Sequence, residues 1–76
     1  MKGGRKIFER MEHAGLGLRR EIRRLANGDL RSLLVYVGKG RRTYADTDVG
    51  IMISALAITE GTRRFVYGRK GKGMSL

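Results

Sequence analysis

The sequence has no cysteine and no tryptophan, and it has one histidine among 76 residues. Without cysteine, neither a disulfide framework nor thiolate ligation of a metal can support the fold. His13 has Glu9 and Glu12 as its nearest acidic neighbours, and this set lacks the residue types of a zinc site or a catalytic triad. We therefore expect no enzyme, no cofactor, no metal site and no small-molecule substrate.

Long apolar runs are also missing. The longest uncharged apolar run covers residues 49–59, which is too short for a helix that must cross a bilayer with roughly 20 residues. Near the start of the chain, Glu9, Arg10 and Glu12 interrupt any apolar segment that could follow the basic residues 1–6, so a secretory signal peptide is not expected. These features predict an intracellular or virion protein and make membrane binding the less favoured interpretation.

Acidic residues are few, at 7 against 17 lysines and arginines, which gives a formal charge of +10. Residues 1–42 hold 12 cations and 4 acids, residues 43–60 hold no cation and 3 acids, and residues 61–76 hold 5 cations and no acid. Such a field suits phosphates, because each neutralised phosphate releases counterions and arginine adds bidentate geometry. The charge predicts nucleic acid, either DNA or RNA, as the partner.

An amphipathic pattern begins at Arg5. Apolar or small residues recur every three or four positions, namely Phe8, Met11, Gly15, Leu18, Ile22 and Leu25, and Ile7 and Leu16 widen this stripe. Most of the arginines in the region lie off the stripe. Because glycine weakens a helix interior, the pattern predicts a basic amphipathic N-terminal helix that is broken near Gly15 and Gly17.

Residues 29–44 allow two structures. Gly28 can adopt the left-handed backbone conformation that often ends a helix, and Asp29 suits the N-cap of a further helix. The apolar residues that follow have helical spacing, but residues 33–37 are also rich in strand-forming types and lead into a glycine-bearing turn. The sequence leaves open a helix or a short β-hairpin over residues 33–44.

The stretch 46–61 has no cation and is apolar on almost every side. Asp46, Thr47 and Asp48 suit the N-terminus of a helix over residues 47–60, and Gly61 suits its C-cap. A chain of this length buries only roughly 60% of the surface that its unfolded form exposes. We therefore expect a homo-oligomer in which this helix contacts other copies through Val49, Met52, Ile53 and Leu56.

Together these patterns predict a mainly α-helical fold, in which the basic N-terminal helix packs on the apolar helix 47–60. We expect one small domain over residues 5–67, a flexible basic arm over residues 1–4 and a basic glycine-rich tail over residues 68–76. The predicted nucleic-acid contacts are Arg5, Lys6, Arg10, Arg19, Arg20, Arg23, Arg24, Lys39, Arg41, Arg42, Arg63, Arg64, Arg69, Lys70 and Lys72. Aromatic rings beside these cations could stack on bases, and they are Tyr36, Tyr44, Phe65 and Tyr67.

Residues Gly15 to Tyr44, GLGLRREIRRLANGDLRSLLVYVGKGRRTY, resemble the recognition helix and wing of winged helix-turn-helix DNA-binding domains. The resemblance implies that residues 18–26 enter the major groove, while Lys39, Arg41 and Arg42 on the wing meet phosphate or the minor groove. The favoured hypothesis is instead a coat or packaging protein that binds nucleic acid without sequence preference. A winged-helix regulator is the first alternative, and a basic ribonucleoprotein component or a membrane-surface cationic helix is a further one.

Overall fold

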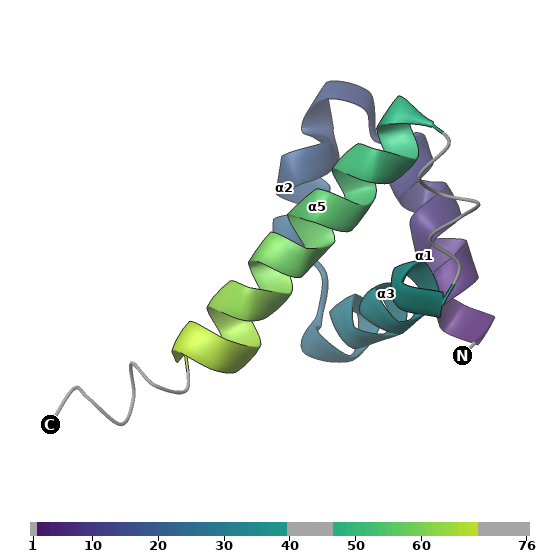
Figure 1. Cartoon of the computed structure of the whole chain (residues 1–76). Coiled ribbons are helices and arrows are strands. Elements are labelled where there is room, and N and C mark those ends of the chain that lie inside the picture. Colours follow the sequence, from purple (N-terminus) through teal and green to yellow (C-terminus); the bar gives the residue numbers. More distant parts are fainter. Residues whose placement is uncertain (1, 40–46, 69–76) are drawn as a thin grey trace, which may run out of the picture.

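The computed structural model describes residues 2–39 and 47–68. These residues form α1 (Lys2–Glu12), α2 (Leu18–Arg23), α3 (Asn27–Lys39) and α5 (Asp48–Thr62), with a 3₁₀ turn at Gly15–Gly17 and a π-helical turn at Arg63–Tyr67 (Figure 1). No strand occurs in the described part of the chain. The prediction of a small, mainly α-helical domain is confirmed.

The corner between α1 and α2 lies at the two glycines. Gly15 has a φ of +59°, a left-handed conformation that side chains with a Cβ rarely adopt, and the 3₁₀ turn then leads into Leu18. Because the chain turns here, Leu16 leaves the apolar stripe in which the sequence pattern placed it. Its side chain is fully exposed in the structure.

The first helix packs mainly along α3 rather than on α5, which differs from the predicted arrangement. It begins at Lys2, so residues 2–4 form its first turn and not a flexible arm. Gly4 is buried, and a Cβ at this position would lie 2.7 Å from the Cβ of Tyr36 and would collide with the backbone oxygen of Ser32. The ring of Phe8 also packs against that of Tyr36, with 5.5 Å between the centroids. Glycine therefore sets how closely α1 approaches α3.

Helix α3 contains residues 33–39, so of the two structures that the sequence left open, the helix and not the β-hairpin forms there. Residues 40–44 lie outside the described part of the chain. Leu30, Leu33 and Val37 share one face of the helix and are buried in the core. Their burial outweighs the weaker preference of this segment for a strand. The predicted cap at Gly28 and Asp29 is also absent, because both residues lie in the first turn of α3.

Helix α5 begins as the sequence predicts and ends differently. Thr47 is the N-cap, and its hydroxyl accepts a hydrogen bond of 2.9 Å from the backbone N–H of Gly50. Gly61 is not a C-cap but a buried interior residue, since the chain remains helical through the π-helical turn. A Cβ at Gly61 would lie 2.7 Å from Cδ1 of Leu34. This second glycine brings α5 close to α3.

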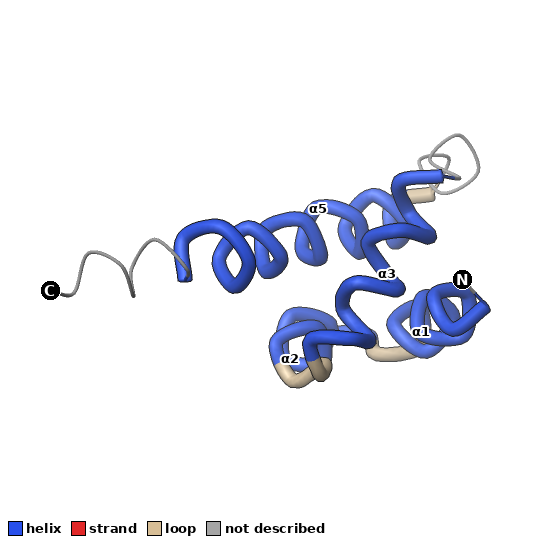
Figure 2. The backbone as a smooth tube through the Cα atoms, turned by 90° about the horizontal axis from the view of Figure 1, so that it is seen from below, coloured by secondary structure: helices blue, strands red, loops and turns tan. Residues whose placement is uncertain are grey.

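The core lies between α1, α2 and α3 on one side and a single face of α5 on the other. It consists of Ile7, Phe8, Met11, Leu18, Ile22, Leu25, Leu30, Leu33, Val37, Ile53 and Ala57. Figure 2 shows α1 and α2 on the same side of α5. The opposite side of α5 is not covered by any other helix of the described chain, although its residues are largely apolar.

We predict that Gly4→Ala destabilises the fold by about 1 to 3 kcal/mol, because the new methyl group overpacks the contact between α1 and α3. Thermal and urea unfolding followed by circular dichroism would measure the change. Gly3→Ala is the matched control, since a Cβ at Gly3 has only Ser32 Oγ nearby, at 4.0 Å. That variant should be neutral or more stable by up to about 1 kcal/mol, from helix propensity. Equal effects of the two substitutions would contradict the close packing at Gly4.

Candidate nucleic-acid interface

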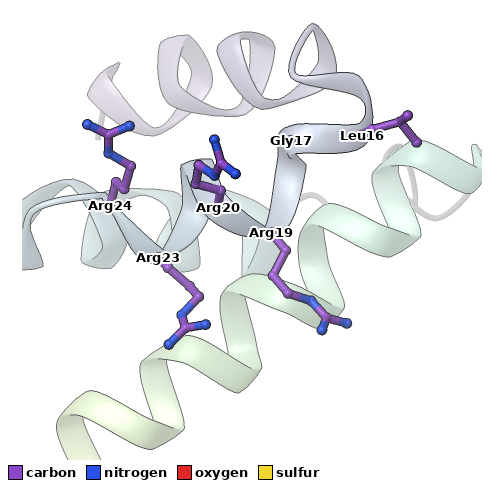
Figure 3. A pocket seen from close by; sticks show the side chains of 6 residues that line it. All are labelled: Leu16, Gly17, Arg19, Arg20, Arg23 and Arg24. Carbon is purple, nitrogen blue, oxygen red and sulfur yellow. The ribbon is translucent and has the colours of Figure 1, made fainter.

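Four arginines lie on the outward side of α2, three within the helix and the fourth, Arg24, at its C-cap. Leu18 and Ile22 are buried against the core, which leaves Arg19, Arg20, Arg23 and Arg24 exposed. With Leu16 and Gly17 they line one open depression (Figure 3). In that view Arg19 and Arg23 point toward α5, whereas Arg20 and Arg24 point to the other side of α2. The alternation of buried and basic residues therefore creates a two-sided cationic ridge.

The arginine side chains of this ridge make no ion pair with any acid in the described part of the chain. Four like charges on so short a helix repel one another, and the repulsion falls only when counterions or a bound anion compensate it. A bound polyanion would relieve this repulsion and release the counterions. The ridge thus has the charge and the accessibility that phosphate binding requires.

A second depression continues the ridge toward α5. Its lining residues are Arg19, Ile22, Arg23, Leu56, Thr59, Glu60 and Arg63. Arg19 and Arg23 border both depressions, so Arg63 joins the α2 arginines on one surface. The side chain of Arg63 is 60% exposed although it also contacts Glu60 at 2.7 Å. The structure therefore brings together five of the predicted binding residues.

Arg64, the sequence neighbour of Arg63, has a different position. Its guanidinium donates to the backbone oxygens of Leu25 at 2.6 Å and Arg23 at 2.7 Å, and to Oε2 of Glu60 at 2.6 Å. A further bond of 3.1 Å reaches Oδ1 of Asn27. The side chain is only 16% exposed. Its donors are occupied within the protein, so Arg64 closes the C-terminal end of α2 and does not belong to the accessible cationic surface.

Glu60 holds both of these arginines. Its carboxylate accepts from Arg63 and Arg64 while the residue is buried. The hydrogen bond from Arg63 is the main cause that lowers the pKa of Glu60, and Arg64 adds to it, while burial acts in the opposite direction. The same contact raises the pKa of Arg63. Glu60 is therefore ionised near neutral pH, and its carboxylate holds the guanidinium groups of Arg63 and Arg64 in place.

The remaining predicted cations are more dispersed. Arg5 on α1 pairs with Glu9 at 3.4 Å, and this pair is exposed. Lys6, Arg10 and Lys39 are exposed on α1 and at the end of α3. The others lie outside the described residues, and they are Arg41, Arg42, Arg69, Lys70 and Lys72. The α2 ridge with Arg63 is thus the densest cationic surface in the described part of the chain.

The predicted stacking residues differ in accessibility. Tyr36 is half-buried beside Phe8, and Phe65 is half-buried under the guanidinium of Arg31, which lies 4.6 Å from the ring centroid. Tyr67 is 64% exposed, and Tyr44 lies outside the described residues. Tyr36 and Phe65 are therefore packing residues in this fold. Tyr67 keeps an accessible ring.

The residues predicted to contact other copies fall on two different sides of α5. Ile53 is fully buried and Leu56 packs against the core, so these two do not form an outer surface, which corrects the prediction. Val49 and Met52 are exposed. Ile51, Ala55 and Ile58 are exposed on the uncovered side, and the sequence pattern did not single them out. Their uniformly apolar helix carries no periodicity that could have distinguished its two faces.

Within the described residues, histidines and carboxylates form no cluster that could hold a metal ion. None of the helices described is both long enough and apolar enough to span a bilayer. No family model, curated protein or solved structure matches the chain.

We predict that Arg64→Gln lowers the free energy of unfolding by about 2 to 4 kcal/mol, because it leaves the buried Glu60 and the backbone oxygens of Arg23 and Leu25 with fewer partners. Urea denaturation would measure the loss. Arg63→Gln is the adjacent control and should cost much less, since its side chain is largely exposed and Arg64 still neutralises Glu60. An equal loss for the two variants would refute the assigned role of Arg64.

The lowered pKa of Glu60 predicts a pH dependence. A carboxylate with a depressed folded-state pKa stabilises the fold above its unfolded value of about 4.3, and this stabilisation disappears as the pH falls through the folded-state value. Unfolding free energies should therefore differ between the unmodified chain and Glu60→Gln at about pH 7, and the difference should shrink as the pH falls below about 4.3 and through the folded-state pKa of Glu60. Glu9→Gln removes an exposed pair and serves as the control, with little effect at either pH. A difference for Glu60→Gln that stays constant down to the pH at which the fold unfolds would contradict the lowered pKa.

Proposed function

We propose that this protein is a non-enzymatic nucleic-acid-binding protein that coats or packages DNA or RNA by neutralising phosphates, as a self-associating subunit. The observation that carries the proposal is the α2 ridge, with four exposed arginines and no ion-pair partner among the described residues. Arg63 extends the ridge across the groove to α5. These groups form a surface to which a phosphate backbone can bind.

Arginine suits this role because its planar guanidinium donates two parallel hydrogen bonds to one phosphate. Arg19 and Arg23 are separated by four residues, which corresponds to about 6 Å along a helix, and the same holds for Arg20 and Arg24. Each side of the ridge can therefore contact separate phosphates of one strand. Such contacts supply affinity and register but carry no base sequence information.

Binding without sequence preference is favoured over the winged-helix alternative. The wing of that family needs a strand where this chain has the last turns of α3. The segment proposed as a recognition helix is helical over only six residues, Leu18–Arg23, and its outward side chains are all basic except Glu21. A surface of this composition favours contacts with the phosphate backbone. A preference for one duplex sequence would favour the alternative.

We predict that replacing Arg19, Arg20, Arg23 and Arg24 together with glutamine weakens nucleic-acid binding about 100-fold or more at 0.1 M salt, and makes the slope of log K against log salt shallower by about 3 to 4. Fluorescence anisotropy with random duplexes and single strands over a salt series would measure both quantities. The four arginines are exposed, so the variant should keep its helical circular dichroism spectrum.

The matched control is Arg5, Lys6, Arg10 and Lys39 replaced by glutamine, which removes the same charge from other surfaces. A control variant as weak as the α2 variant would show that total charge and not the ridge determines binding. Replacement of the four α2 arginines by lysine should preserve the salt slope and lose part of the affinity. Binding that is no stronger to nucleic acid than to acidic lipid vesicles would overturn the proposed function.

A further inference from the structure

The depression between α2 and α5 combines cations with apolar side chains. It is lined by Arg19, Ile22, Arg23, Leu56, Thr59, Glu60 and Arg63, and we call it the α2–α5 groove. Its volume of about 450 Å³ lies within the range of about 300 to 1,000 Å³ that is usual for ligand-binding clefts. Arg19 and Arg23 point toward α5 in Figure 3. A bound group would therefore meet cations from α2 and, at the end of α5, from Arg63.

One of these cations is held in a fixed orientation. Arg63 donates from Nε and Nη2 to the carboxylate of Glu60, at 3.2 and 2.7 Å, and Glu60 is buried. Among the described residues, Nη1 of Arg63 has no hydrogen-bond partner. Arg64 also donates to Glu60, at 2.6 Å, so two guanidinium groups compensate the carboxylate and its charge does not exclude an anion. Arg63 thus keeps one edge of an oriented guanidinium for a phosphate.

An exposed aromatic ring follows Arg63 on the same face. Leu56, Glu60 and Arg63 line the groove at intervals of four and three residues, and Tyr67 lies four residues after Arg63. Residues at such intervals are neighbours on one helix face. Tyr67 is 64% exposed, and the apolar side chain of Leu56 is half-buried in the groove. Cations that contact a phosphate backbone, with an accessible ring beside them, form the combination that binds unpaired bases.

A duplex fits this arrangement poorly. Packed helices lie about 8 to 10 Å apart, whereas the major groove of B-DNA alone is about 12 Å wide, so a duplex cannot enter between α2 and α5. Its bases are paired and stacked, and their faces are therefore not accessible to Tyr67 or Leu56. A single strand offers both of the required groups, because its phosphates are charged and each unpaired base has a face that can stack.

We infer that the α2–α5 groove binds single-stranded nucleic acid, with phosphates on Arg19, Arg23 and Arg63 and an unpaired base stacked on Tyr67. The inference rests on the proposed function and adds to it a preference for unpaired strands. The two fail separately. Equal affinity for single strands and duplexes would overturn the inference and leave the proposed function in place.

Substitution of the ring tests the stacking contact. In fluorescence anisotropy, an oligothymidine should bind the unmodified chain more tightly than a duplex of the same length does. Tyr67→Ala should weaken oligothymidine binding about 5- to 150-fold, as the loss of one stacked base does, and should leave duplex binding unchanged. Tyr67→Phe keeps the ring and should bind like the unmodified chain. Val66→Ala, at the adjacent exposed position, is the matched control and should have no effect.

An abasic strand separates the contribution of the base from that of the phosphates. A deoxyribose phosphate strand of the same length carries the same charge but offers no base, so it should bind the unmodified chain and Tyr67→Ala equally. An equal loss of affinity for the abasic strand and the oligothymidine would show that the ring acts through the fold and not on a base, and the inference would be wrong.

The phosphate contact of Arg63 is tested against Arg5, which also pairs with a glutamate but lies on α1. Both substitutions to glutamine remove one charge. Arg63→Gln should make the slope of log K against log salt for the single strand shallower by about 0.7, the value for one phosphate contact. Arg5→Gln should leave the slope nearly unchanged. Equal slopes for the two variants would contradict the assignment of the groove as the binding site.

Discussion

The guanidinium of Arg64 is the contact on which the position of α2 depends. A helix of six residues is not stable by itself, and the backbone oxygens at its C-terminal end have no helical partner. Arg64 donates to the oxygens of Arg23 and Leu25 from the far end of α5, and Glu60 holds the guanidinium in place. The largely covered cation of Arg64 also complements the negative end of the helix dipole. One inward arginine therefore stabilises the short helix whose other arginines face outward.

Local side-chain chemistry predicted the helical class, the break at Gly15 and the start of α5 at Thr47 correctly, because each depends on neighbours in the sequence. Gly61 was predicted as a helix end because glycine often adopts a left-handed conformation there. In this fold the absence of its Cβ matters instead, since Leu34 occupies that space. A sequence does not distinguish these two uses of glycine. Residues 33–37 of α3 include strand-forming types, but they are helical because this conformation buries Leu30 and Leu33 in the core. That burial is a tertiary effect, which local propensity does not include.

The candidate site, too, was predictable from the sequence only where its features depend on neighbouring residues. The basic face of α2 followed from the spacing of buried residues, and the four arginines are exposed as that spacing predicts. Arg63 and Arg64 are identical neighbours in the sequence, yet one is largely exposed and the other is bonded to three backbone or carboxylate oxygens. Arg64 contacts backbone oxygens of residues 39 and 41 positions earlier in the chain, and these contacts distinguish its role from that of Arg63. For α5, the apolar composition predicted an outer surface, but it did not indicate on which side that surface lies.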